Sequence, residues 1–172
     1  MVVRRPDVKG SITAGYTLPL MILGGTLVTA SACIESIFAH RQIIWWMYAA
    51  GVLACMSSFV LRAFAARALG RYWSMQIELR KDQPLVRTGP FAWVRHPIYT
   101  AALLETASAL VLCQAYWSMI PAVTVLVPCV LLRIKLEERA MLAHFGEHYA
   151  AYMKEVPPLI AFSRFSKAPA RT

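Results

Sequence analysis

Four long apolar blocks place the strongest constraint on how this chain folds. They cover about residues 16–38, 43–65, 98–112 and 119–132. Each of the first two is long enough to cross roughly 30 Å of hydrocarbon as a helix rising about 1.5 Å per residue. The last two are shorter, and a turn-like stretch, 114–118, joins them. The pattern predicts an all-α, multi-pass bundle of about four transmembrane helices, the last two forming a hairpin.

The composition favours lipid over water as the main solvent. The 172 residues are 58% hydrophobic and 16% charged, whereas a soluble domain averages roughly 45–50% and 25%. A chain this small cannot bury so much apolar surface in its own interior. The first apolar run follows Arg4, Arg5 and Lys9, as a signal peptide would. It is too long for a signal core and no convincing cleavage site follows, so we interpret it as a retained span.

The distribution of Lys and Arg predicts the orientation. Of the 18 basic residues, 16 fall in the N-terminal tail, in the segment 66–97 or in the stretch after the fourth block, and the first outer loop holds only Arg41. Because cytosolic loops carry the excess of positive charge, both termini are expected in the cytosol. Anionic lipid headgroups explain the net charge of +9 better than a nucleic acid does, so no nucleic-acid partner is expected.

The chain divides into two regions. Residues 1–65 hold the N-terminal tail and the first two spans, and residues 66–172 hold the rest. The second region contains the polar segment 66–97, the hairpin and a charged stretch, 133–156. The charged stretch has helical spacing and predicts a cytosolic C-terminal helix. Two prolines at 157–158 end this helix, since proline cannot continue a hydrogen-bonded turn.

The tract before the third block holds the first candidate site. Gly89-Pro90 is typical of a turn, and Pro97 fits the first turn of a helix, where its missing N–H costs nothing. Arg95 and His96 then lie at the positive end of that helix, which suits an anion or the polar edge of a ligand. Tyr99 can share a face with His96. The alternative is a juxtamembrane anchor, with Arg95 on a lipid phosphate and Tyr99 in the aromatic belt.

Charged residues beyond the fourth block form the second cluster. Arg133 and Glu137 are four apart on one helical face, which permits an ion pair, and Glu138 follows. The alternative is a solvated charged face. Without a matching set of His or Asp at ligand spacing, no metal is expected. Inside the third block, Glu105 is costly in lipid and should face the protein, paired with Arg62 or hydrogen-bonded within the bundle.

These two clusters together resemble the isoprenylcysteine carboxyl methyltransferase family and, more distantly, the phospholipid N-methyltransferases. The match begins near Gln76 and covers roughly the C-terminal three-fifths of the chain. Its motif residues are Leu85-Val86, Gly89-Pro90-Phe91, Arg95-His96-Pro97-x-Tyr99, Glu137-Glu138, Phe145-Gly146, Tyr149, Tyr152 and Val156-Pro157. Two positions depart from the family: Phe91 stands where Tyr is frequent, and Ala101 stands where Gly is common.

The resemblance implies a membrane-embedded methyltransferase that uses S-adenosylmethionine, with S-adenosylhomocysteine as the product, and that has no Rossmann domain. The sequence agrees, since no glycine-rich loop follows a strand pattern. By resemblance, Arg133 and Glu137 are the catalytic residues and Arg133 also binds the substrate. The implied cofactor contacts are Gln76, Gln83, Pro84, Leu85, Val86, Phe91, His96, Pro97, Ile98, Tyr99 and Glu137.

The acceptor stays open at the level of sequence. Short chains that resemble this family look bacterial, so a bacterial cytoplasmic membrane is expected, and bacteria generally lack the processing of prenylated proteins. The favoured hypothesis is therefore O-methylation, on a carboxyl or phenolic hydroxyl, of a lipophilic small molecule, and a prenylated or lipid acceptor is the other possibility. Either acceptor would arrive sideways between helices, while the polar cofactor enters from the cytosol between the segment 66–97 and the C-terminal helix. The alternatives are a phospholipid N-methyltransferase, a non-catalytic membrane scaffold of the same fold, and a membrane reductase, for which no nicotinamide motif is present.

Overall fold

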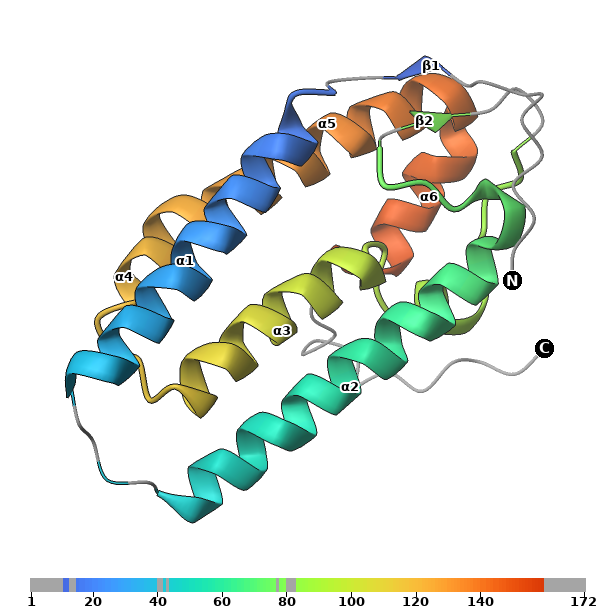
Figure 1. Cartoon of the computed structure of the whole chain (residues 1–172). Coiled ribbons are helices and arrows are strands. Elements are labelled where there is room, and N and C mark those ends of the chain that lie inside the picture. The colour runs from blue at the N-terminus through green and yellow to red at the C-terminus, as the bar shows by residue number, and fades with distance from the viewer. Residues whose placement is uncertain are drawn as a thin grey trace.

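The computed structural model describes residues 11–12, 15–39, 42, 44–76, 78–79 and 83–159. Helices dominate it (Figure 1), as predicted. The long elements are α1 (Thr17–Ala39), α2 (Trp45–Leu69), α3 (Pro97–Leu112) and α5 (Val127–Phe145). The short ones are α4 (Met119–Pro121), α6 (Glu147–Glu155), the 3-10 turns η1 (Gly70–Tyr72) and η2 (Gly89–Ala92), the π-helical η3 (Ala122–Leu126), and the strands β1 (Ser11–Ile12) and β2 (Glu78–Leu79).

Three helical rods are long and apolar enough to cross a membrane. They are α1, α2 with η1, and the continuous rod Met119–Phe145 that α4, η3 and α5 form. The third apolar helix, α3, has 16 residues, which gives it a length of about 24 Å against roughly 30 Å of hydrocarbon. The chain is thus an integral membrane helical bundle, and a fourth full crossing by α3 stays a prediction.

The bundle packs through small residues and a modest apolar core. Helices α2 and α3 make the most extensive helix–helix contact. Gly51 permits this contact, because a Cβ built on it would lie 2.7 Å from Cγ of Leu112. The core joins α1, α3, η3 and α5 through buried side chains that include Val28, Leu110 and Val130.

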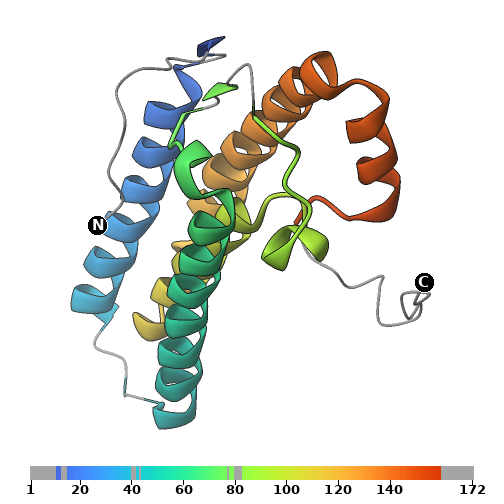
Figure 2. The ribbon, with the colours of Figure 1, turned by 90° about the vertical axis from the view of Figure 1, so that its right-hand side faces the viewer.

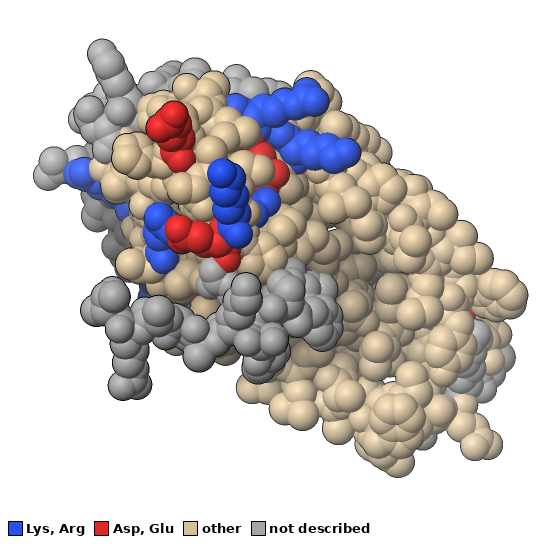
Figure 3. Space-filling view, turned by 180° about the vertical axis from the view of Figure 1, so that it is seen from behind, with Lys and Arg blue, Asp and Glu red and all other residues tan. Residues whose placement is uncertain are grey.

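The surface divides into an apolar part and a charged end. In Figure 3, nearly all the visible Lys, Arg and Glu side chains of the described residues gather over one end of the face, and the rest of the described surface in this view is almost entirely uncharged. Large apolar side chains along α1 and α2 are exposed, as lipid contact requires. At the end that the sequence predicts to be the outer one, Trp46 is 72% exposed and Trp117 is 73% exposed, which fits an aromatic belt at the headgroup level.

Glu35 fastens the outer turn to the end of α1. Its carboxylate accepts hydrogen bonds from the backbone N–H groups of Trp117 (3.1 Å) and Ser118 (2.9 Å), and from the Ser118 hydroxyl (2.9 Å). These N–H groups begin the rod Met119–Phe145, so a carboxylate there satisfies donors that the helix itself cannot. The turn lies where the sequence predicts it.

The predicted single C-terminal helix is interrupted. The chain reverses at Gly146, whose φ of +54° is a conformation that favours glycine. Helix α6 consequently turns back from the end of α5, and Figure 2 shows the segment that precedes α3 lying between them. As predicted, α6 ends just before Pro157 and Pro158. The reversal places α6 along one side of the cavity described next.

Candidate functional site

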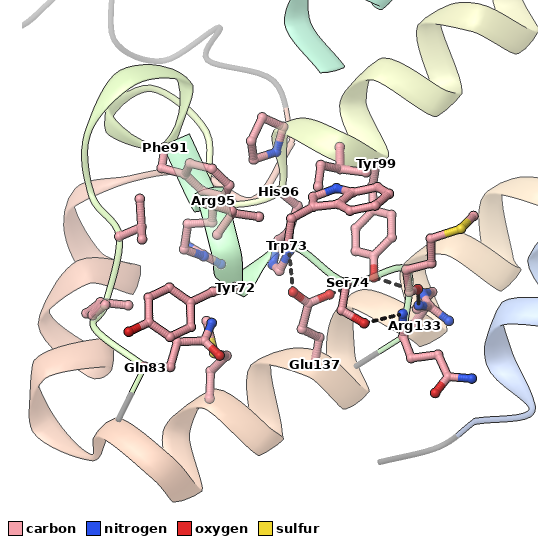
Figure 4. A pocket seen from close by; sticks show the side chains of 18 of the residues that line it. Tyr72, Trp73, Ser74, Gln83, Phe91, Arg95, His96, Tyr99, Arg133 and Glu137 are labelled. Atoms are coloured by element: carbon pink, nitrogen blue, oxygen red, sulfur yellow. Dashed lines mark hydrogen bonds and ion pairs between the residues drawn. The ribbon is translucent and has the colours of Figure 1, made fainter. Parts of the chain in front are cut away.

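A cavity opens at the charged end of the bundle, where segments distant in the sequence meet (Figure 4). We call it the main cavity. The end of α2, the segment 72–76, the tract 83–99 and the inner faces of α5 and α6 line it. Its empty space, about 1290 Å³ including the part open to solvent, lies between these segments.

The structure brings every predicted site residue to this one cavity. The residues of this set that line it are Gln76, Gln83, Pro84, Leu85, Val86, Phe91, His96, Pro97, Ile98, Tyr99, Arg133 and Glu137. They come from both predicted clusters. In the sequence, the whole helical hairpin lies between these clusters. Their assigned roles in binding and catalysis stay predictions.

Tyr99 connects the two clusters at the centre of the cavity. Its hydroxyl donates to Glu137 Oε2 across 2.6 Å and accepts from Arg133 Nε across 2.8 Å. The spacing of Arg133 and Glu137 permits a direct ion pair, but the structure does not form one. The phenol lies between the two charges instead, because Tyr99 projects from α3 toward the face of α5 that carries both (Figure 4).

Arg133 is buried, with 2% of its surface exposed. Besides Tyr99, its guanidinium donates to Thr17 Oγ1 at 2.9 Å and to the backbone carbonyl of Met75. It thereby ties α1, the segment after α2, and α3 around α5. Direct contact of Arg133 with an acceptor stays a prediction, since these hydrogen bonds engage each of its three nitrogens with protein oxygens.

Arg95 points into the protein, so the alternative that it anchors a lipid phosphate is wrong. It is 8% exposed, and its Nε and Nη2 donate to Glu138 Oε1 at 3.0 and 2.6 Å. Its Nη1 also donates to the carbonyls of Met153 (3.0 Å) and Val156 at the end of α6. A buried guanidinium is well suited to this position, because its several N–H groups can donate to a carboxylate and to carbonyls at a helix end at the same time.

His96 shares the carboxylate of Glu138 and borders that of Glu137. Its Nε2 lies 3.2 Å from Glu138 Oε1, and its Nδ1 lies 3.9 Å from Glu137 Oε1. Its ring stacks near Tyr99, with centroids 5.6 Å apart. The backbone N–H of His96 donates to the Pro158 carbonyl at 3.0 Å, which holds the start of α3 against the segment after α6.

Two tyrosines of α6 form the wall opposite α3. Tyr149 and Tyr152 are 1% and 2% exposed. The Tyr152 hydroxyl donates to the Phe91 carbonyl at 2.5 Å, so α6 holds η2 in place. Burial, and then the charges of Glu138 and Glu137, raise the pKa of Tyr149 well above its ordinary value, and this phenol stays neutral.

The segment between α2 and β2 also lines the cavity, and the sequence reasoning did not assign it. Tyr72, Trp73, Ser74 and Met75 border the space next to Gln76. A run of aromatic and polar residues just after a predicted span was the available signal. Trp73 is labelled in Figure 4 beside His96 and Tyr99, at the mouth of the site.

A second cavity, which we call the bundle cavity, lies among the apolar helices. It is lined from α1, α2, α3, η3 and α5, and it encloses about 910 Å³ that is partly open to the surroundings. Met21 and Ala102 line both cavities, so the two are neighbours. The predicted pairing of Glu105 with Arg62 is confirmed, and it lies at this boundary.

The comparisons agree with this geometry. The model of the isoprenylcysteine carboxyl methyltransferase family matches residues 49–143, which is more than half of the chain. An uncharacterized Bacillus subtilis protein, YpbQ, is 30% identical over 77% of this chain and 79% of its own length. The protein-S-isoprenylcysteine O-methyltransferase of Rattus norvegicus is 29% identical over 80% of this chain. This chain spans 51% of the rat protein, about half its length.

A solved structure shares the fold. It is that of the eukaryotic intramembrane Ras methyltransferase named isoprenylcysteine carboxyl methyltransferase, with a TM-score of 0.68 and 27% sequence identity. The match covers 84% of this chain and 53% of the solved one.

Proposed function

Because the chain belongs to the isoprenylcysteine carboxyl methyltransferase family, we propose that it transfers a methyl group from S-adenosylmethionine to an oxygen of a lipophilic acceptor. The observation that carries this proposal is the single cavity in which the tract 83–99 and the acidic face of α5 meet. The reaction would take place at the cytosolic side of the membrane, where the charged end of the bundle is expected.

The lining of the main cavity fits the parts of the cofactor. Leu85 and Val86 lie in an extended segment, and their backbone N–H and C=O groups make no hydrogen bond to other described residues. They can therefore bond the edge of adenine while their side chains and Phe91 cover its face. Glu137 can accept hydrogen bonds from amino or hydroxyl groups, and its negative charge favours a cationic ligand.

Methyl transfer from a sulfonium depends more on the positioning of the two reactants than on acid–base groups. When bound, the cofactor supplies a methyl carbon already activated by a sulfonium. Transfer would form a bond from the acceptor oxygen to this methyl carbon and would leave the electron pair of the broken carbon–sulfur bond on sulfur. A carboxylate acceptor releases no proton, so no general base is required; a phenol would lose one proton to water.

The protein's own residues then have two tasks. Arg133 and Tyr99 hold Glu137 in one orientation through the hydrogen bonds given above, and alignment of this kind is a large part of catalysis by proximity. The aromatic and aliphatic walls exclude water, which strengthens the electrostatic contacts inside. Residues such as Tyr149, neutral and buried, complete the wall without adding charge.

The bundle cavity favours a lipophilic acceptor. It lies next to the main cavity but among apolar helices, so an apolar tail entering from the lipid can rest there while its polar head reaches the cofactor. A phospholipid amine would be methylated on nitrogen and would leave a cation in the same place. The non-catalytic scaffold differs from both, since it predicts no binding of the cofactor.

The test is a transfer experiment on membranes that contain the protein. Membranes are incubated with S-adenosylmethionine labelled in its methyl group, and the labelled lipids are separated and identified by mass spectrometry. Label in a methyl ester or ether of a lipophilic molecule is expected, and Glu137→Gln should reduce it strongly when the cofactor is below saturation. Label in phospholipid headgroups would favour N-methylation, and no protein-dependent label above an empty-membrane control would contradict the proposal.

A further inference from the structure

An ion pair marks the boundary between the two cavities. Arg62 of α2 lines the main cavity, and its Nη2 donates to Oε2 of Glu105 on α3, which lines the bundle cavity. Met21 and Ala102 border both spaces beside this pair. Charged residues inside a membrane bundle are costly and commonly mark the path of a polar ligand. The pair thus joins a residue that lines one cavity to a residue that lines the other.

Arg62 has N–H groups that make no hydrogen bond within the described part of the chain. A guanidinium carries five N–H groups, and within the described part of the chain Arg62 places one nitrogen, Nη2, on Glu105. Its Nε is buried and has no hydrogen-bond partner there, while its side chain as a whole is 40% exposed. Arg133 differs, because it is 2% exposed and hydrogen bonds to protein oxygens engage each of its nitrogens.

We propose that Arg62 binds the anionic oxygen of the acceptor and that Glu105 regulates how tightly. This inference rests on the proposed function and adds the residue that recognises the head of the substrate. Glu105 neutralises the guanidinium while no acceptor is present. An acceptor places its oxygen anion on the guanidinium of Arg62, which lines the main cavity, and its apolar tail lies in the bundle cavity.

Opposite effects of the two partners follow from this arrangement. Without Arg62 the acceptor loses its charge-assisted hydrogen bond, which is among the stronger contacts a ligand can make. Without the negative charge of Glu105 the guanidinium is uncompensated and attracts an anion more strongly. A purely structural pair would behave differently, since loss of either partner would then weaken the binding of every ligand alike.

The experiment measures equilibrium binding of two probes that differ only in the head, dodecanoate and dodecanol. Radiolabelled probes are titrated onto the protein in nanodiscs of neutral lipid, with S-adenosylhomocysteine present. The variants are Arg62→Gln, Arg62→Lys and Glu105→Gln. The matched control is Arg67→Gln, because Arg67 is an exposed arginine on the same helix that borders neither cavity.

Arg62→Gln should weaken dodecanoate binding by about tenfold, the effect of losing one hydrogen bond to a charged group. Arg62→Lys should retain part of it, Glu105→Gln should tighten it, and Arg67→Gln should leave it unchanged. Dodecanol should bind all variants alike. Equal binding of dodecanoate to wild type and Arg62→Gln, or weaker binding to Glu105→Gln, would overturn the inference.

A separate readout keeps this result apart from the proposed function. S-adenosylhomocysteine binding is measured on every variant without a fatty probe, and it should stay within about twofold of wild type. Failure of the wild type to bind it would refute the proposed function instead. If Arg62→Gln alone loses it, that variant has misfolded, and Glu105→Gln then decides: tighter dodecanoate binding supports the inference, and unchanged or weaker binding overturns it.

Discussion

The Tyr99 hydroxyl donates a 2.6 Å hydrogen bond to the Glu137 carboxylate and so joins the first turn of α3 to the acidic face of α5. Arg133 donates to the same phenol oxygen. One hydroxyl therefore fixes the position of the buried Arg133 guanidinium relative to the Glu137 carboxylate, which faces the cavity. We expect the orientation of the Glu137 carboxylate to depend on this three-residue arrangement.

Replacement of Tyr99 by Phe removes the shared hydroxyl and leaves the ring. Glu137 and Arg133 each lose a partner, so the carboxylate is no longer held in one orientation. Affinity for S-adenosylhomocysteine should fall by about tenfold, or about 1.4 kcal/mol, as expected for one hydrogen bond to a charged group. Calorimetry in detergent measures it. Tyr116→Phe, at the exposed outer turn, is the matched control, and equal losses in both variants would count against a specific role for Tyr99.

The neighbouring glutamates should separate into two functions. Glu137→Gln should lower cofactor affinity by roughly tenfold or more with little change in thermal stability, since its carboxylate faces the cavity. Glu138→Gln should destabilise the fold, because it removes the counter-charge of a buried Arg95; breaking such pairs costs about 3–5 kcal/mol. Melting temperature and calorimetry on the same preparations test both, and a reversed pattern would show that the roles are misassigned.

Arg95→Lys keeps the charge but loses the fork that binds Glu138 and the carbonyls at the end of α6. An ammonium cannot satisfy these groups together, so α6 should be held less firmly, by about 1–3 kcal/mol. Hydrogen exchange of the amides in 147–155 should speed up while that of α2 stays the same. Arg139→Lys changes an exposed arginine of α5 and should have no effect; unaltered exchange in Arg95→Lys would show that α6 docks by other means.

Gly146→Ala tests the reversal between α5 and α6. No atom lies within 4 Å of the added Cβ, so the cost arises from the backbone alone, at φ +54°. A decrease in the free energy of unfolding of about 1–2 kcal/mol is expected. Gly25→Ala, in a helix and equally free of neighbours, should be neutral or stabilising. Similar melting temperatures for wild type and Gly146→Ala would mean that the turn is not constrained.

Local patterns in the sequence were sufficient for much of the fold. Apolar length predicted α1 and α2, and proline placement predicted the start of α3 and the end of α6. The motif around His96 and the acidic pair predicted which segments form the main cavity. The helix boundaries depend on residues that are close together in the chain. The two halves of the cavity could be connected because both clusters resemble the same family.

The features that sequence reasoning missed depend on contacts between distant segments. Arg95 reads locally as a surface cation, yet Glu138 and the α6 carbonyls, 43 to 61 residues away, draw it inside. Glu35 reads as an interfacial carboxylate, yet it holds the first N–H groups of the turn more than 80 residues later. Gly146 did carry a signal, since glycine after a helix commonly reverses the chain.

The central claim is that the tract 83–99 and α5 form one pocket for S-adenosylmethionine. Calorimetric titration of S-adenosylhomocysteine into the purified protein tests it most directly, with Glu137→Gln and the outer-turn variant Tyr116→Phe in parallel. We predict saturable binding at one site per chain that Glu137→Gln weakens and Tyr116→Phe leaves intact. No saturable binding by a folded wild-type protein, or binding that Glu137→Gln leaves unchanged, would contradict it.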